Sequence, residues 1–228
     1  LTIFWLQPGF AVTILWNLKS TAGYVDTSPG VGDLDRDGIL DLVFCTTAGR
    51  IMAVKSIGLE MWTFDANAQI TNPPVVIELD GDQSLNVLAM TNTGKLLCLD
   101  GRTGTNLWSY NLPGEVVWGT TSIAAANLVH DANPEIIIVD REGNLTCLSH
   151  SGDLVWSQKF KGAFNTCPAI ADLDGDGENE ILAGSSDSPL ICFSAKGKEK
   201  WRITDLESSG SSPLVYDLDN DNQLEILL

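Results

Sequence analysis

Three short acidic segments of this chain carry enough oxygen atoms to bind a hard metal ion. They are DLDRDGILD from Asp33, DLDGDGENE from Asp172 and DLDNDNQLE from Asp217. Each has carboxylates at positions 1, 3, 5 and 9, and Gly or Asn at position 6, where a sharp turn requires a positive φ. Calcium takes six to eight oxygen ligands, and alternate residues of a tight turn direct their side chains to one centre. The segments therefore predict bound Ca²⁺.

We expect the side chains at positions 1, 3, 5 and 9 and the backbone carbonyl at position 7 to be the ligands. The predicted ligands are Asp33, Asp35, Asp37, Ile39 and Asp41 in the first loop, Asp172, Asp174, Asp176, Glu178 and Glu180 in a later one, and Asp217, Asp219, Asp221, Gln223 and Glu225 in the last. A calcium ion held in this way is expected to be structural, because it neutralises carboxylates that otherwise repel one another.

Two further segments are related but weaker. The segment 78–86 keeps three acids and is predicted to bind poorly, through Glu78, Asp80, Asp82, Ser84 and Asn86. The segment 127–135 has Val129 at position 3, so we expect this loop to be empty.

The spacing of these acids is similar to the start of an EF-hand, which we reject on two grounds. An EF-hand needs an acidic residue at position 12 and a helix on each side. Position 12 here is Phe44, Ala183 or Leu228, and the flanking residues are typical of strands.

The acidic segments recur at a fixed period, which predicts a repeat architecture. The five segments begin at residues 33, 78, 127, 172 and 217, in steps of 45, 49, 45 and 45 residues. Tryptophans at positions 16, 62, 108, 156 and 201 recur at nearly the same period, and we expect them to pack between repeats. Trp5 and Trp118 lie off this period, and Trp118 is the better of the two as a candidate for a functional aromatic residue.

Each repeat contains four short apolar stretches separated by turn residues, which predicts an all-β fold, a β-propeller with four-stranded blades. We expect complete blades at 24–64, 70–110, 118–158 and 164–203 and half-blades at 1–18 and 213–228, all in one propeller domain over 1–228. Two interpretations stay open: either the two half-blades join into a fifth blade, or the chain is a fragment of a larger propeller.

The bulk properties narrow the class of protein. The net charge of -17 argues against nucleic acid as a partner, because phosphate binding needs clustered Lys and Arg. Direct membrane insertion by this segment is not expected, since its apolar opening is short and interrupted. The 5 cysteines are odd in number and are all expected on strands, Cys98, Cys147 and Cys192 at equivalent positions and Cys45 and Cys167 on other strands, which predicts buried thiols. Asn144 begins an acceptor pattern for glycosylation, whose use is left open.

The repeated segments of the chain resemble known classes of repeats. PGVGDLDRDGILD and PAIADLDGDGENE resemble the FG-GAP repeat of integrin α-subunit propellers, whereas GKLLCLDGRTGTNLWSY and GNLTCLSHSGDLVWS resemble the quinoprotein-type, PQQ-like repeat. The resemblance implies a calcium-binding module that is extracellular, periplasmic or lumenal, secreted or part of an anchored protein. It also implies a binding surface displayed on one propeller face.

We therefore expect a non-enzymatic adhesion or interaction module whose partner is a protein or a glycan. We assign no catalytic residue, because neither His130 nor His150 lies near a Ser or Cys nucleophile pattern. The alternatives are a propeller enzyme, either a polysaccharide lyase or a quinoprotein dehydrogenase, and a scaffold subunit of a large assembly.

Overall fold

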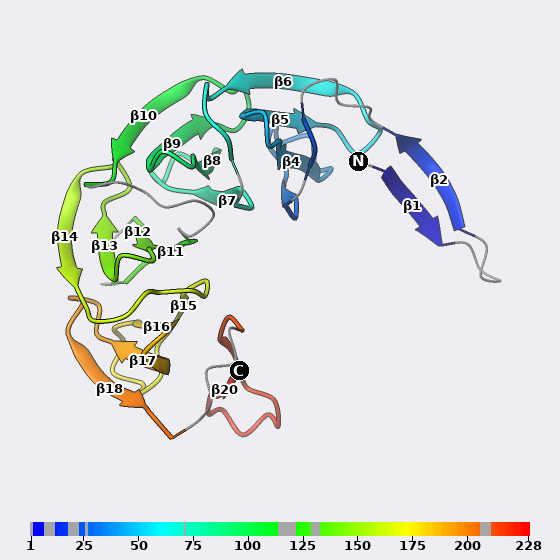
Figure 1. Cartoon of the computed structure of the whole chain (residues 1–228). Helices are drawn as coiled ribbons and strands as arrows, with labels where there is room; N and C mark the ends of the chain where they lie inside the picture. The colour runs from blue at the N-terminus through cyan, green and yellow to red at the C-terminus, as the bar shows by residue number, and fades with distance from the viewer. Residues whose placement is uncertain are drawn as a thin grey trace. The chain divides into compact units, whose positions relative to one another are not determined.

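The structure is a computed structural model that describes residues 2–6, 12–17, 23–25, 27–70, 72–113, 122–128, 133–205 and 211–228. Within these ranges all regular structure is β-strand, in four four-stranded antiparallel sheets and two strand pairs. Figure 1 labels the strands of these sheets and colours them by residue number. We number the four-stranded sheets blades 1 to 4.

The strands of each blade pair in sequence order, as in a meander. Blade 1 contains β3 (Gly30–Gly32), β4 (Asp41–Cys45), β5 (Arg50–Val54) and β6 (Glu60–Asp65). Blade 2 contains β7 (Val75–Glu78), β8 (Leu85–Met90), β9 (Lys95–Asp100) and β10 (Asn106–Asn111). Blade 3 contains β11 (Ser122–Ala126), β12 (Glu135–Val139), β13 (Asn144–Leu148) and β14 (Leu154–Lys159). Blade 4 contains β15 (Ala169–Ala171), β16 (Glu180–Ser185), β17 (Ser188–Phe193) and β18 (Glu199–Ile203).

The two strand pairs are β1 (Thr2–Leu6) with β2 (Val12–Asn17), and β19 (Leu214–Tyr216) with β20 (Glu225–Leu227). The register of β1 and β2 shifts beside Trp16, as the two outer strands of every blade do beside their own tryptophan. This shared irregularity supports the interpretation of β1 and β2 as the outer half of a blade.

The middle strands of each blade are buried on both faces, which explains their continuous apolar sequences. All six residues of β16 and all six of β17 are buried, whereas most residues of β18 are exposed. The buried strands therefore supply the core, and the first and fourth strands cover its edges.

The chain divides into two compact units, each with its own core. The first unit comprises Leu1–Glu78 and Gln83–Val116, and its core joins residues of blades 1 and 2. The second comprises Leu79–Asp82 and Val117–Leu228, and its core joins residues of blades 3 and 4. The single-domain organisation and the total number of blades stay predictions.

The periodic tryptophans pack between neighbouring blades, as predicted, where the structure describes their contacts. The indole N–H of Trp62 donates to the carbonyl of Gly101 in the next blade at 2.7 Å, and that of Trp156 donates to the carbonyl of Ala195 at 3.2 Å. Cys98, Cys147 and Cys192 are the cross-strand partners of Trp108, Trp156 and Trp201, so a small side chain faces each large ring. Trp118 lies outside the described residues.

The cysteines are free thiols, and the prediction that they are buried fails for one of them. Cys45, Cys98, Cys147 and Cys192 are buried within strands. Cys167 is exposed, because it lies in the connection before β15 and not within the strand.

The acceptor asparagine of the glycosylation pattern is the first residue of β13, directly after a turn. The side-chain amide of Asn144 donates to Asp140 at 2.8 Å, and the hydroxyl of Thr146 pairs with that of Ser157 at 2.9 Å. Thr146 is buried. The folded conformation therefore disfavours modification of Asn144.

In the part of the chain that the structure describes, no helix has the length and apolar character needed to cross a membrane.

Candidate metal centres

Each acidic loop connects the first strand of a sheet to the second, so the repeat places it at the same end of every blade. The leucine at position 2 anchors the loop: Leu34, Leu79 and Leu128 are buried. Strands flank every described loop, which confirms the rejection of an EF-hand.

The loops are tight turns with two left-handed residues each. The residue at position 6 has a positive φ, as predicted: 84° at Gly38, 91° at Gly177 and 66° at Asn222. Position 4 also has a positive φ, which the sequence analysis missed: 62° at Arg36, 73° at Gly175 and 63° at Asn220. With left-handed residues at positions 4 and 6, the backbone N–H groups of the turn point inward, toward the carboxylate at position 1.

The carboxylate at position 1 accepts those inward hydrogen bonds. Asp33 accepts from the backbone N–H groups of Asp37 and Gly38 at 3.1 and 2.9 Å. Asp217 accepts from Asp221 and Asn222 at 3.1 and 3.0 Å. Asp172 accepts from Gly175 and Gly177 at 2.7 and 3.0 Å in the same way. The first acid thus shapes the loop before any ion is present.

The acid at position 9 closes the loop by accepting a hydrogen bond from the backbone N–H at position 2. The pairs are Asp41 with Leu34 at 3.1 Å, Glu135 with Leu128 at 2.9 Å, Glu180 with Leu173 at 2.9 Å and Glu225 with Leu218 at 2.7 Å. We name this contact the clasp. It uses one carboxylate oxygen and leaves the other for a cation. Burial raises the pKa of Asp41.

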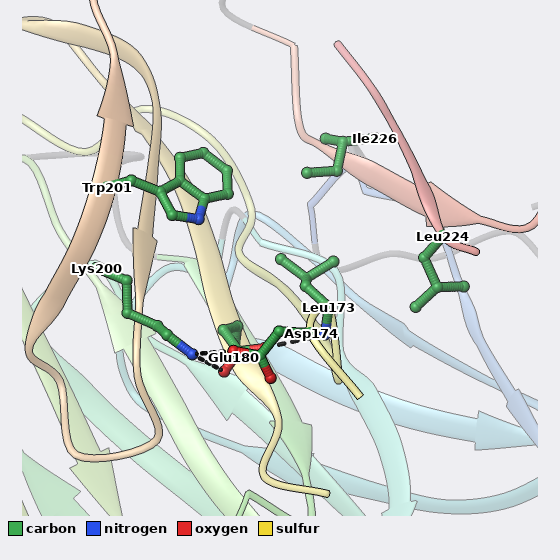
Figure 2. Close-up of a pocket in the computed structure, with 7 residues that line it drawn as sticks. All are labelled: Leu173, Asp174, Glu180, Lys200, Trp201, Leu224 and Ile226. Carbon is green, nitrogen blue, oxygen red and sulfur yellow. Dashed lines mark hydrogen bonds and ion pairs between the residues drawn. The ribbon is translucent and has the colours of Figure 1, made fainter. Parts of the chain in front are cut away.

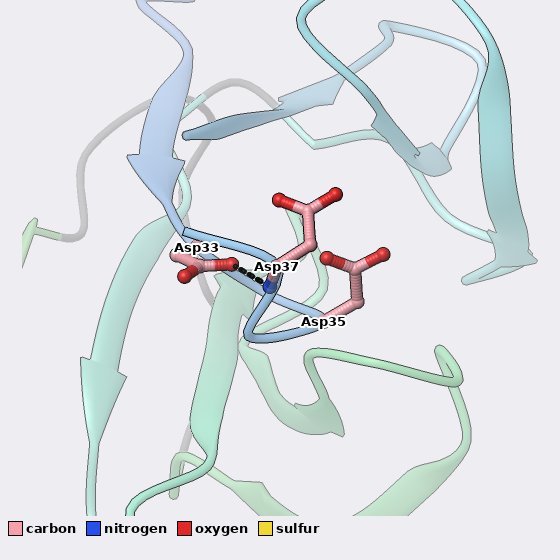
Figure 3. A group of neighbouring side chains, drawn as sticks. All are labelled: Asp33, Asp35 and Asp37. Atoms are coloured by element: carbon pink, nitrogen blue, oxygen red, sulfur yellow. Dashed lines mark hydrogen bonds between the residues drawn. The ribbon is translucent and has the colours of Figure 1, made fainter. Parts of the chain in front are cut away.

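The loops gather three acids each, but not the same three. Carboxylate oxygens of Asp33, Asp35 and Asp37 lie within 4.8 Å of one another, and Figure 3 shows these side chains on one turn. In the two later loops the acid at position 9 joins the group in place of position 5, giving the sets Asp172, Asp174, Glu180 and Asp217, Asp219, Glu225.

The acids at position 5 of the later loops instead stabilise the turn. Asp176 accepts from the backbone N–H of Glu178 at 2.8 Å, and Asp221 accepts from that of Gln223 at 2.7 Å. Asp37 makes the same bond to Ile39 at 2.9 Å. Ligation through the carbonyls of Ile39, Glu178 and Gln223 stays a prediction.

The second loop also gathers its acids, since oxygens of Glu78, Asp80 and Asp82 lie within 4.8 Å of one another. Ser84 accepts a hydrogen bond from the guanidinium of Arg36 at 2.8 Å, and Asn86 is buried in β8. In the third loop residues 129–132 lie outside the described residues, so its predicted emptiness stays a prediction.

Two lysines contact the acidic groups, and the sequence did not predict these contacts. The ammonium of Lys55 lies 2.5 Å from Asp35 and 2.7 Å from Asp37. The ammonium of Lys200 lies 2.6 Å from Asp174 and 2.8 Å from Glu180, as Figure 2 shows. The hydrogen bond from each lysine lowers the pKa of its partner, Asp37 or Asp174. Each lysine lies 18 residues or more from its partners, so local spacing gave no signal.

A cavity of about 400 Å³ adjoins Lys200. Figure 2 shows its lining, which consists of Leu173, Asp174, Glu180, Lys200, Trp201, Leu224 and Ile226. Trp201 is 38% exposed here, unlike Trp62, which the next blade covers.

Comparison with known proteins establishes the class. Residues 135–216 match a family described as the lambda-carrageenase β-propeller domain. BamB from Moraxella catarrhalis is similar over 88% of this chain and 58% of its own, with a TM-score of 0.66 and 19% identity. Rhamnogalacturonan lyase YesW is similar over 98% of this chain and 48% of its own, with a TM-score of 0.65 and 18% identity. Saccharomyces cerevisiae Sqt1 is similar over 99% of this chain and 62% of its own, with a TM-score of 0.74 and 13% identity.

The chain is therefore a β-propeller built from four-stranded repeats, as the period of the sequence predicts. It spans about half to three fifths of the length of these structural neighbours. At such low identity the likeness shows the fold alone. No curated protein matches the sequence. The FG-GAP and PQQ-like resemblances stay interpretations of the sequence.

Proposed function

We propose that this chain is a calcium-binding β-propeller segment that acts without catalysis as an interaction module for a protein or a glycan. One observation carries the proposal. Three loops, at 33–41, 172–180 and 217–225, repeat one turn in which the backbone holds the first acid and the acids converge on a point. Oxygen ligands converging in a tight loop are the donors that calcium prefers.

The ion would act through stability. Three carboxylates within 4.8 Å repel one another when the loop is folded and empty. An ion that binds the folded loop and not the unfolded chain stabilises the fold by mass action. The stabilisation from several calcium sites of modest affinity on one chain adds up.

The proposed location follows from the same chemistry. Calcium is plentiful outside the cytosol, where even sites of millimolar affinity fill. We therefore propose an extracellular, periplasmic or lumenal protein. The ions would fix the loops at one end of the blades as a rigid surface, on which a protein or glycan ligand binds.

The test is calorimetric titration of the calcium-free chain with Ca²⁺, paired with thermal unfolding in calcium and in chelator. We expect about three ions to bind, and the melting temperature to rise with calcium more than with magnesium. Magnesium demands a stricter octahedral geometry than a flexible loop supplies. Asp217→Asn with Asp219→Asn should remove one ion. Asp153→Asn, an exposed acid in the turn between β13 and β14, is the matched control. An unchanged melting temperature and no heat of binding would refute the proposal.

A second function is favoured by the match of residues 135–216 to the lambda-carrageenase propeller domain. Under it, the chain belongs to an enzyme that cleaves an acidic polysaccharide. Incubation with carrageenans and pectic polysaccharides, with assays for new reducing ends and unsaturated sugars, separates the two functions. Product formed by the purified chain favours the enzyme, whereas retention of a polysaccharide without cleavage favours the interaction module.

A further inference from the structure

Two of the acidic loops already hold a cation that belongs to the chain itself. The ammonium of Lys55 contacts two of the three acids gathered in loop 33–41, Asp35 and Asp37. The ammonium of Lys200 contacts two of the three gathered in loop 172–180, Asp174 and Glu180. In each case the positive charge contacts two of the acids that could hold a metal ion.

The two lysines reach their loops from different places in the repeat. Lys55 directly follows β5, the third strand of blade 1, whereas Lys200 lies in β18, the fourth strand of blade 4. The residue that corresponds to Lys200 in blade 1 is Met61, which directly precedes Trp62 as Lys200 precedes Trp201. Repetition of sequence therefore does not explain the two contacts. Their shared property is charge.

We infer that Lys55 and Lys200 are intramolecular counter-cations that compete with calcium for loops 33–41 and 172–180. The inference rests on the proposed function. In the ion-free chain each ammonium offsets the repulsion between carboxylates. On three of these acids the ammonium occupies the oxygen that the turn leaves open: Oδ2 of Asp37, Oδ2 of Asp174 and Oε1 of Glu180. The other oxygens of these acids already accept hydrogen bonds from the backbone N–H groups of Ile39, Asp176 and Leu173. Calcium that binds these acids through their open oxygens therefore displaces the lysine.

The last loop differs. Asp217, Asp219 and Glu225 gather as the other acids do, but in the described part of the chain no ion pair reaches them. Among the described residues, calcium therefore has no cation to displace from this loop. Loop 217–225 should therefore be the tightest of the three sites and the least stable when it is empty.

Lys200 has space into which it can withdraw. Its side chain lines the cavity of about 400 Å³ together with Trp201 and three apolar residues of the lining, Leu173, Leu224 and Ile226 (Figure 2). An ammonium displaced from Asp174 can turn into this cavity, which Trp201 also lines. A cation beside an aromatic face is an accepted arrangement.

The experiment uses Lys55→Met and Lys200→Met, singly and together, in the whole chain. Methionine keeps the apolar stem and removes the charge. Each substitution should tighten calcium binding at its own loop about tenfold, the effect expected from two partly exposed ion pairs. It should also lower the melting temperature in chelator, since the acids lose their counter-charge. The rise in melting temperature on adding calcium should therefore be larger than in the parent chain.

Lys161→Met is the matched control, because Lys161 also pairs with an acid, but that acid is Asp187, which lies outside the acidic loops, and the Lys161 side chain is 93% exposed. The ion count is read in a background carrying Asp217→Asn and Asp219→Asn, so that only the lysine-bearing loops contribute. Assignment of each site follows from which lysine substitution changes the affinity.

The outcomes separate this inference from the proposed function. Calcium binding by the parent chain with no change in the lysine variants overturns the inference and leaves the proposed function standing. Absence of calcium binding from the parent and from every variant, loop 217–225 included, overturns both. Calcium binding that appears at loop 33–41 or 172–180 only when its lysine is removed supports the inference in its strongest form.

Discussion

Glu135 accepts a hydrogen bond from the backbone N–H of Leu128 at 2.9 Å, although the loop between them has Val129 where the other loops have an acid. The same clasp joins Glu180 to Leu173 in a loop with a full set of acids. The acid at position 9 therefore has a structural role that does not depend on an ion, and this explains why it is present in the third loop.

The clasp predicts that Glu135→Ala destabilises the fold by about 1–3 kcal/mol, the cost of leaving a partly buried backbone N–H without its charged acceptor. Glu135→Gln keeps an oxygen acceptor and should cost much less. Chemical denaturation with and without calcium measures both. The loss should be the same in either condition, and a loss that calcium reverses would show that Glu135 is a ligand.

The second loop carries a backbone strain that substitution should relieve. Gln83 occupies position 6 with a φ of 68°, where other loops have Gly38, Gly177 or Asn222. Gln83→Gly should stabilise the chain by about 0.5–1 kcal/mol, because glycine adopts this conformation without a steric cost. Gly38→Gln is the reverse change, at a site where a Cβ meets nothing within 4 Å, and should destabilise by a similar amount. Equal stability of both variants and the parent would contradict this prediction.

The contact between Trp62 and the next blade predicts a strong effect at Gly104. A Cβ at Gly104 would lie 2.5 Å from the indole ring of Trp62. Gly104→Ala should therefore destabilise by roughly 2–4 kcal/mol, through steric overlap in a packed interface. Gly175→Ala separates the backbone effect from this overlap, since Gly175 has nearly the same φ, 73° against 72°, and open space around it. Thermal unfolding should rank Gly104→Ala well below Gly175→Ala.

Thiol chemistry tests the burial of the repeat. Burial raises the pKa of Cys45, Cys147 and Cys192 to about 12, so these thiols stay protonated where an ordinary cysteine ionises, near pH 8–9. In the folded chain, alkylation at neutral pH should modify Cys167 alone, and raising the pH to 9 should not expose the buried thiols. In denaturant all five should react. Mass spectrometry of peptides reports each site, and rapid native labelling of Cys147 would contradict the described packing.

The sequence alone determined the strand repeat, its period and the positions of the acidic turns. These features are local: alternation within strands, turn residues such as Gly38 and Asn222, and a leucine at position 2 act over a few neighbouring residues. For the same reason the left-handed conformation at position 6 was predictable. The left-handed residue at position 4 was missed because the residue type there varies among Arg36, Gly175 and Asn220, and Arg36 by itself does not favour a positive φ.

Only the tertiary structure decided which acids of each loop lie close together and which lysines contact them. Glu180 joins its loop's acids where Asp176 does not, whereas Asp41, which also begins the strand after its turn, does not join the acids of the first loop. Lys55, directly after β5, and Lys200, in β18, contact acids 18 to 26 residues earlier in the chain, and Trp62 donates to Gly101, 39 residues later. Contacts across such separations depend on how strands pair and blades stack, and no short window of sequence contains that information.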